Sequence, residues 1–538
     1  MKFFPISLTA KFCVTGALSL VLAGTVPLRA QTPTASSLQP DNAELHGNPV
    51  FPKVFLRDVV VSNTDPNLKN TDKFYNSEPG IAIDPTDPRR IVISAFSGSW
   101  TPLDNGPQFR AAPLWYSRNG GQVWTKEHAI SPPPGVRKGV LVESPCDITF
   151  DYGRDGTLYG TFLLDGSGEE GGGCSGPIEE AARPEAAERG EIISGATADP
   201  AHAGAWQWLA PGGITQPTNH HNGADQPWIT VNKDPSRPRR DRVYVAYQSS
   251  AMQVAAAKAR PPLDFTLDSS PGPSTQFGGN PGLRIAADHR SGAIYSVHET
   301  GAPIQCSSGS PVSYVLNRSV DGGATWSLNS SPDGISVAQV CSNQNIYTYG
   351  FGEPFPGAIL GGVNRLRGGI DTLAVDPKTG DVYVVYGVFD EPADRDRLAI
   401  VRLVDRGDGW MEPRHPHFVS GTEYQSALPA VAVNDQGTVA VLYDTADGLD
   451  EDTSRPYFSV HLAASQDHGQ SFRQVLLQKF LLPENSPGSG NAGPRPLGDY
   501  QQLKSFHDAF YGVFAGDGQP FGRPFHKIDP IFVKTSAP

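Results

Sequence analysis

The chain has 538 residues, 58 of them Gly and 49 Pro, and its formal net charge is -13. This charge argues against a nucleic-acid-binding protein, because phosphates require clustered Lys and Arg. The many turn-forming residues favour numerous short strands over long helices. Length alone allows one large domain or three small ones.

Residues 1–30 are predicted to be a signal peptide. Lys2 and Lys11 supply a positive flank, residues 12–24 an apolar stretch, and Ala30 a cleavage site. That stretch is too short for a membrane anchor, and no later segment could span a bilayer. Thr25 stands where a lipid-anchored bacterial protein needs Cys. We therefore expect a secreted or periplasmic protein, with residues 31–50 as a polar linker.

Export changes the interpretation of the cysteines. Four remain after removal of the signal peptide, and an even number in an oxidising compartment indicates disulfides. The pairing of sequence neighbours, Cys146–Cys174 and Cys306–Cys341, is favoured among the three alternatives. Zinc is the weaker interpretation, because no two of these cysteines lie at ligand spacing.

A repeated hairpin sets the fold. Each copy is an apolar strand, a turn rich in Asp, Gly and Pro, and a second strand rich in Val and Tyr. The spacing between copies is roughly one four-stranded blade plus loops. Seven copies occur, starting near Glu78, Cys146, Gln226, Leu283, Ile370, Leu428 and Tyr500.

A second motif, Ser-x-Asp-x-Gly-x-x-Trp, falls between some of these hairpins. Its Asp can accept backbone N–H bonds in a tight turn, its Gly permits an unusual backbone conformation, and its aromatic packs between sheets. These roles are structural and not chemical. The motif appears as Ser319, Asp321, Gly323 and Trp326, as Ser465, Asp467, Gly469 and Phe472, and in degenerate form as Ser117, Asn119, Gly121 and Trp124.

With these motifs the chain resembles the sialidase-like superfamily of Asp-box (BNR-repeat) proteins over nearly all of its mature length. The resemblance implies an all-β propeller in which residues 51–538 form one domain. We predict seven blades, with six as the alternative, because sialidase catalytic domains have six. Only one clear strand follows the last hairpin, so residues 53–61 are expected to complete that blade and close the ring.

Loop lengths distinguish the two faces of the expected propeller. The turns inside the hairpins are short, whereas the other connections are long, such as residues 97–113, 165–190, 209–224 and 341–368. In a propeller the long connections share the face around the mouth of the central channel. Long loops on a rigid scaffold are where binding and catalysis usually occur, although they can also be decoration.

Polar residues at the starts of the inner strands are candidates for a site at that mouth. Carboxylates with Arg and His in a cleft suit recognition and cleavage of glycans. Taken singly, an Asp at such a position is more often a turn or strand cap than a catalyst, and a His pair is more often part of a solvated loop than a base. The candidate catalytic residues are Glu78, His221, Asp225 and Asp371, and the candidate substrate-binding residues are His220, Gln226, Arg284, Arg365, Arg367 and Tyr500.

These features predict an exported carbohydrate-active protein, a glycoside hydrolase of sialidase-like type or a polysaccharide lyase. Sialidases hold the substrate carboxylate with three arginines, one of them in an Arg-Ile-Pro motif that is absent here. The alternative is a non-catalytic propeller that binds glycans or proteins at the cell envelope. We expect a monomer acting on a glycan or another small polar substrate, with no required cofactor. No metal ligands are assigned, and Ca²⁺ is considered only as a structural ion.

Overall fold

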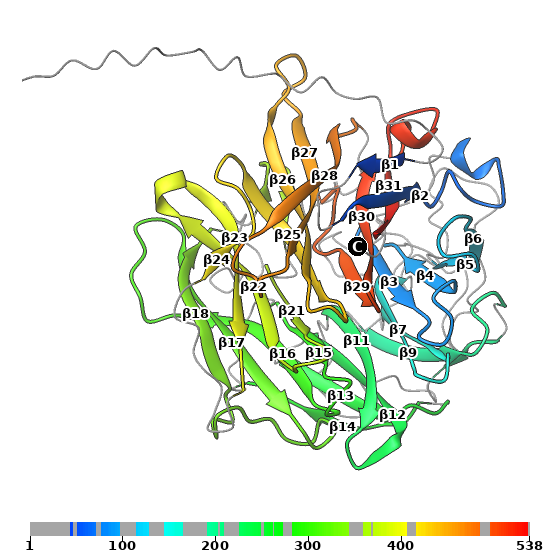
Figure 1. Ribbon diagram of the computed structural model, residues 1–538, viewed down its shortest axis with the longest axis vertical. Helices are drawn as coiled ribbons and strands as arrows, with labels where there is room; N and C mark the ends of the chain where they lie inside the picture. Colours follow the sequence, from blue (N-terminus) through cyan, green and yellow to red (C-terminus); the bar gives the residue numbers. More distant parts are fainter. Residues whose placement is uncertain are drawn as a thin grey trace, which may run out of the picture. The chain divides into compact units, whose positions relative to one another are not determined.

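Seven β-sheets follow one another around a ring, so the chain is an all-β, seven-bladed propeller (Figure 1). The computed structural model describes residues 43–46 (backbone only), 51–70, 77–96, 114–127, 145–164, 191–202, 205–208, 225–248, 252–261, 263–272, 282–343, 359–366, 370–405, 416–484 and 495–535. The predicted seven blades are thereby confirmed. Residues 1–30 lie outside the described part, so the signal peptide stays a prediction.

The first four blades each contain four antiparallel strands, numbered outward from the centre of the ring. Blade 1 has β3 (Gly80–Ile83), β4 (Ile91–Ser94), β5 (Leu114–Ser117) and β6 (Thr125–Glu127). Blade 2 has β7 (Pro145–Tyr152), β8 (Leu158–Leu164), β9 (Glu191–Thr197) and β10 (Gln207–Trp208). Blade 3 has β11 (Asp225–Asp234), β12 (Arg237–Gln248), β13 (Met252–Lys258) and β14 (Phe265–Ser269). Blade 4 has β15 (Arg284–Ala287), β16 (Ile294–Gly301), β17 (Ser310–Ser319) and β18 (Ile335–Ser342).

The remaining blades continue this order. Blade 5 has β21 (Asp371–Val375), β22 (Val382–Asp390), β23 (Arg395–Leu403) and β24 (His417–Phe418). Blade 6 has β25 (Gln425–Val433), β26 (Val439–Leu449), β27 (Pro456–Ser465) and β28 (Arg473–Leu481). Blade 7 has β29 (Gln502–Phe506), β30 (Ala509–Asp517), β31 (Ile528–Thr535), β2 (Lys53–Asp58) and β1 (Ala43–His46). Outside the blades are the hairpin β19 (Ile359–Leu360) and β20 (Asn364–Arg365) and three 3-10 turns, Leu68–Asn70, Glu391–Ala393 and Gln519–Phe521.

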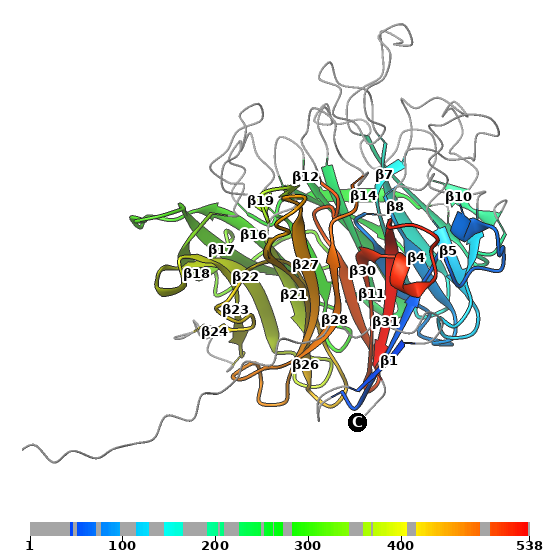
Figure 2. The same ribbon diagram turned by 90° about the horizontal axis from the view of Figure 1, so that it is seen from above.

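Strands from the two ends of the chain close the ring in blade 7. Strand β2 pairs antiparallel with β31, with Leu56 opposite Val533, and β1 adds a fifth strand outside it. Figure 2 shows the blue β1 beside the red β31. The predicted closure is confirmed, but the strand ends at Asp58, because its carboxylate accepts the N–H groups of Val60 (2.7 Å) and Val61 (3.0 Å) and turns the chain.

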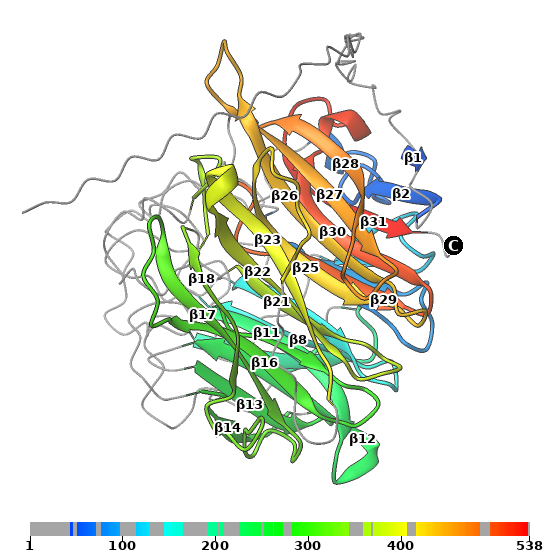
Figure 3. The same cartoon turned by 60° about the vertical axis from the view of Figure 1, so that its left-hand side comes forward.

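The hydrophobic core lies between neighbouring blades, which pack face to face (Figure 3). Strand β22 illustrates the consequence for sequence: its first six residues, VYVVYG, are all buried. A strand covered on both faces has no solvent side, so it reads as an unbroken apolar run instead of an alternating one. The predicted Val- and Tyr-rich second strand of each hairpin is this strand.

Three turns at the outer strands share one hydrogen-bond pattern. In each, a Ser hydroxyl donates to a carboxylate or amide oxygen two residues on and accepts the N–H of a Gly four residues on. Asn119 Oδ1 accepts the N–H four residues on, as Asp321 and Asp467 do, but it lacks the second bond that each acid accepts from a hydroxyl group. Gly121 is required because a Cβ would lie 2.2 Å from the Phe532 ring, at a φ of +88°.

One of the two predicted disulfides is observed. Cys306 and Cys341 are bonded, with their Cα atoms 5.6 Å apart, and join the start of blade 4's outer hairpin to its last strand. Cys174 and the side chain of Cys146 lie outside the described residues, so that bridge stays a prediction. Within the described residues, no helix is long and apolar enough to cross a membrane.

Candidate functional site

The inner strands begin at one end of the ring, here called the mouth end, and the backbone there is unusual. Glu78, Gln226 and Leu428 each have a φ of +54°, and each precedes a proline. The strand pairing slips beside two of them, between Asp225 and Trp228 and between Ala427 and Ala430. Positive φ in a residue other than Gly costs roughly 1–3 kcal/mol and is concentrated at functional sites. Bulges of this kind re-aim side chains.

Arg495 is the centre of a buried ion-pair cluster at the mouth end. It lies just before β29, and its Nη2 atom contacts Glu78 Oε1 (2.6 Å) and Asp499 Oδ2. Burial lowers the pKa of Arg495, but the nearby carboxylates, Asp499 and Glu78 first, outweigh burial and raise it. Glu78 Oε1 also accepts the Asp499 N–H at 3.1 Å, which ties blade 1 to blade 7.

Asp147, from β7, lies beside Glu78, and its surroundings favour its neutral form. Burial raises the pKa of Asp147 well above its usual value, and the charge of Glu78 and a hydrogen bond to Glu78 raise it further. No N–H or hydroxyl group of the described residues donates to Glu78 Oε2, so a protonated Asp147 is the donor that fits. Repulsion between the two neighbouring acids favours a proton on Asp147.

A second network crosses the ring from one side to the other. Gln226 of blade 3 donates to Asp499 Oδ2 of blade 7 at 3.1 Å and accepts from Arg284 Nη2 of blade 4 at 3.0 Å. The Arg284 guanidinium also lies over Trp228, 4.7 Å from the ring centroid. Trp228 meets Tyr500 of blade 7 edge to face at 5.6 Å. These contacts join blades 3, 4 and 7 across the centre of the ring.

Two further carboxyl groups lie in the next blades. Asp371, at the start of β21, is 4% exposed, and neither of its oxygens accepts a hydrogen bond from another described residue. Burial raises its pKa well above the usual value, the charge of Glu299 raises it further, and Arg284 opposes both. Burial likewise raises the pKa of Asp444, of which one oxygen accepts from Gln501 at 2.9 Å.

The structure brings together five of the ten predicted site residues. Glu78, Gln226, Arg284 and Tyr500 belong to the two networks, and Asp225 acts on Asp147 and Arg495 through its charge. Asp371 lies one step further around the ring, near Arg284. Arg365 is half-buried on β20. His220, His221 and Arg367 lie outside the described residues.

Sequence reasoning missed the cation that organises the site. Arg495 lies in a predicted long connection, and its importance depends on its position four residues before Asp499. Asp147 and Asp499 were recognisable as polar residues at inner-strand starts, yet their contact with Glu78 needs the closed ring. Asp444 and Gln501 show no sequence signal, because Asp444 lies in the middle of a second strand, directly after the apolar run VAVLY.

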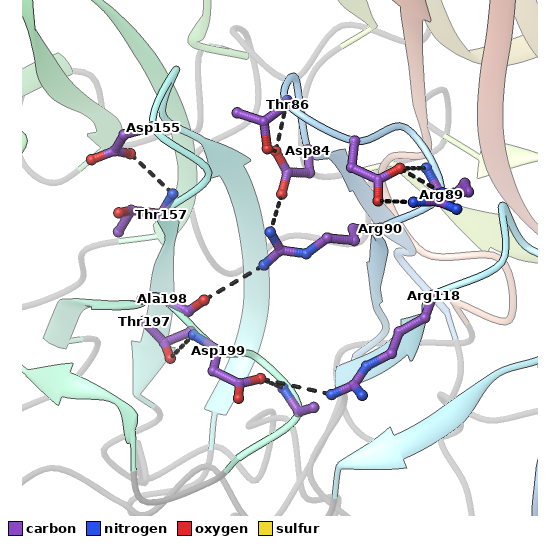
Figure 4. Close-up of polar contacts among 12 residues, drawn as sticks. Asp84, Thr86, Arg89, Arg90, Arg118, Asp155, Thr157, Thr197, Ala198 and Asp199 are labelled. Carbon is purple, nitrogen blue, oxygen red and sulfur yellow. Dashed lines mark hydrogen bonds and ion pairs between the residues drawn. The ribbon is translucent and has the colours of Figure 1, made fainter.

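At the opposite end of the ring, here called the turn end, each carboxylate drawn in Figure 4 has a hydrogen-bond or ion-pair partner. Asp84 Oδ1 accepts from Thr86 N (2.8 Å) and Oγ1 (2.7 Å), and Oδ2 pairs with Arg90 at 2.6 Å. Asp155 accepts the Thr157 N–H at 3.0 Å in the neighbouring turn. These short turns are those inside the predicted hairpins, and their acids are structural.

No metal centre is found among the described residues, since no group of three or more His, Cys, Asp or Glu side chains there could hold an ion. The mouth-end acids contact one another in pairs and are joined by Arg495 and Arg284. A structural Ca²⁺ stays a prediction.

No family model matches the chain, and no curated protein matches it. Among solved structures it is similar to a protein of unknown function from Dyadobacter fermentans (13% identity; 90% of this chain and 99% of that chain; TM-score 0.41). It is also similar to a polysaccharide lyase of family PL25, an ulvan lyase (10%; 85% and 94%; 0.42), and to leech intramolecular trans-sialidase (12%; 70% and 65%; 0.39). Similarity this distant carries no argument about activity, which must come from the residues themselves.

Proposed function

We propose that the protein is an exported carbohydrate-active enzyme, a glycoside hydrolase that acts on a glycan at the mouth end of its propeller. The observation that supports this most is the state of Asp147. Burial, and then the charge of Glu78, raise the pKa of Asp147, which is the shift that a general acid requires, because its proton must be present at the working pH.

In this proposal Asp147 protonates the oxygen of the glycosidic bond as that bond breaks. Asp225 lies at the start of β11 in the next blade and is more exposed than Asp147, so it can meet the sugar or an attacking water. It acts as base or nucleophile, the second carboxylate that glycoside hydrolysis uses. Glu78 positions the proton of Asp147, and Arg495 holds Glu78 in place.

We also propose that the three turns with the shared Ser–Asp/Asn–Gly pattern are Asp-boxes, as the sequence resemblance implies. Their hydrogen bonds are satisfied within each turn, and their aromatic residues pack between blades. This supports a structural role and no part in the reaction. Replacing Asp321 with Ala would then lower stability and leave activity unchanged.

The proposal is tested by incubating purified full-length protein with a glycan panel and measuring released reducing ends and unsaturated products separately. Asp147→Asn and Asp225→Asn should each lower kcat by 10²-fold or more, because general acid–base catalysis contributes that much. Asp87→Asn is the matched control, since Asp87 lies in an exposed turn at the turn end.

Three outcomes separate the alternatives. Unsaturated products would identify a polysaccharide lyase in place of a hydrolase. Glycan binding without any product would identify a non-catalytic binding propeller. Full activity in both mouth-end variants would rule out the proposed roles of Asp147 and Asp225.

A further inference from the structure

His298 is a fully buried histidine between blades 3 and 4, and no step of the proposed reaction uses it. It lies on β16 and is 0% exposed. Its ring points towards blade 3, since a Cβ atom on Gly272 would lie 2.9 Å from His298 Nε2 and 3.0 Å from Met252 Cε. Neither ring nitrogen has a hydrogen-bond partner among the described residues. A neutral imidazole carries one donor and one acceptor, so leaving both unpaired costs free energy.

Two more polar side chains face the same space. Ser296 precedes His298 by two residues and therefore lies on the same face of β16. Gln248 ends β12 and is paired with Met252 of β13, so their side chains also share a face. Both polar residues are buried, and Ser296 Oγ, Gln248 Oε1 and Gln248 Nε2 accept or donate no hydrogen bond within the part of the chain that the structure describes. Together with the apolar residues around them, these three polar side chains form what we call the blade 3–4 seam. Its apolar members include Ala246, Met252, Val254, Leu283, Ile285 and Ile294.

The charged side chains that face the seam from the described strands lie at its turn end, whereas His298 lies near the mouth end. They are Asp234, Arg242, Lys258 and Asp321. Glu299 follows His298 on β16 but points to the other side, where it accepts the Ile370 N–H of blade 5 at 3.1 Å. A proton on His298 would therefore have no counter-charge beside it.

The titratable group of the seam besides His298 is Tyr244, and burial raises the pKa of its phenol, which stays neutral. The connecting segments 249–251 and 273–281 contain no charged or titratable residue in their sequence. Burial lowers the pKa of His298 to about 4. The neutral Gln248 and Ser296 can offer dipoles to an imidazolium but cannot replace a counter-charge.

His461 of blade 6 provides a contrast. Burial also lowers its pKa to about 4, but the charge of Asp447 opposes this shift. Its Nε2 atom lies 3.1 Å from Thr445 Oγ1, and its ring stacks on Tyr443 with centroids 5.1 Å apart. A histidine with these partners has groups around it that can respond to a proton, whereas His298 has apolar neighbours and no bond.

The seam lies behind two contacts of the mouth-end site. Arg284 of blade 4 donates to Gln226 of blade 3 at 3.0 Å and lies 4.7 Å from the centroid of the Trp228 ring. Both contacts join blade 3 to blade 4 at the mouth end. Separation of these two blades at the seam would therefore break them.

We propose that the blade 3–4 seam is an acid-sensitive joint, in which protonation of His298 parts the two blades and uncouples Gln226 from Arg284. Above the ordinary histidine pKa of about 6.5, His298 is neutral whether the seam is closed or open, and the joint stays closed. As the pH falls from there towards the lowered value, the open form takes up a proton first, and the closed form loses stability. Near the lower end of this range the opening equilibrium constant should have risen by roughly 10²-fold.

The experiment is hydrogen exchange of the full chain at about pH 7.5 and about pH 4.5, with rates corrected for the pH dependence of intrinsic exchange. We expect peptides from β12 and β16 to lose up to roughly 10²-fold in protection at the acid pH, and more than peptides from β26 and β27 of blade 6. His298→Phe keeps a ring without a titratable group, and His298→Gln keeps a polar side chain without one. Both variants should abolish the extra loss in β12 and β16, whereas the matched control His461→Gln should not.

Two results would overturn this proposal. One is an acid response of β12 and β16 that is the same in the wild type and in a His298 variant. The other is a wild type in which these strands lose no more protection than those of blade 6, a comparison that needs no variant to fold. Neither result bears on the proposed enzymatic function, since His298 takes no part in it.

Discussion

The two ends of the inner hairpins treat the same kind of side chain in opposite ways. At the turn end, Asp84 has both oxygens engaged, by Thr86 and by Arg90 (Figure 4). At the mouth end, Asp371 is as deeply buried but accepts no hydrogen bond from another described residue. An acid that caps a turn stabilises the fold, whereas a buried acid without partners costs free energy. The difference therefore distinguishes the structural end of the ring from the end that is available for a ligand.

The largest expected effect is the loss of the central cation. Arg495→Met should destabilise the protein by roughly 3–5 kcal/mol, because it leaves Glu78 and Asp499 buried without their partner. Chemical denaturation measures this change. Arg89→Met at the turn end breaks an ion pair whose Arg side chain is 73% exposed, and should change the stability little.

A double variant sharpens this result. Adding Glu78→Gln to Arg495→Met removes one of the stranded charges and should restore part of the lost stability. Equal losses of stability in Arg495→Met and Arg89→Met would show that the mouth-end cluster contributes no more to stability than a surface ion pair.

The disulfide has the next largest effect. Cys306→Ser with Cys341→Ser opens a link that spans 35 residues, which in the chain-entropy account costs roughly 3–4 kcal/mol. The measurement is urea unfolding of the double variant against the oxidised wild type. Reductant should lower the stability of the wild type at least to that of the double variant, and a further effect of reductant on the double variant would indicate the predicted Cys146–Cys174 bridge.

Matched Asp→Asn changes at the two ends should differ in sign. Asp84→Asn loses the buried ion pair with Arg90 and should cost about 1–3 kcal/mol. Asp371→Asn replaces an acid that has no partner in another described residue by a neutral group of the same shape, so stability should be unchanged or slightly higher. Thermal unfolding of both variants tests this, and a large loss in Asp371→Asn would reveal a partner for that side chain.

The smallest expected effect is the pH dependence of the stability difference between Asp371→Asn and the wild type. The pKa of Asp371 is raised in the folded protein, so this side chain does not lower the stability of the wild type at pH values below the unfolded pKa of about 4. As pH rises from there towards the raised folded value, the unfolded chain releases its proton first and stability is lost. The Tm advantage of Asp371→Asn should therefore be absent near pH 4 and grow towards neutrality. An advantage that shrinks with rising pH would contradict the assignment.

The fold could be predicted from sequence because each blade repeats its own local signal. An apolar strand, an Asp- or Gly-containing turn and a buried second strand are set by neighbouring residues, as around Asp376 and Gly380. The short turns inside the hairpins and the closing strand could be predicted from the same local patterns. The site could be predicted only in part, since its contacts join blades far apart in sequence. Gln226 and Asp499 are 273 residues apart, and only ring closure brings them together.

Because β2 pairs with β31, the time at which blade 7 can assemble depends on the order in which the chain is synthesised. The first strands of the ring leave the ribosome long before residues 528–535 exist, so blade 7 cannot assemble until the chain is nearly complete. Contacts between such distant segments slow folding. They also leave one edge of β2 unpaired in the meantime, and an exposed edge can pair with another chain. A truncation that removes β2 would thus expose β31 and convert a closed ring into a molecule prone to exchange strands with its copies.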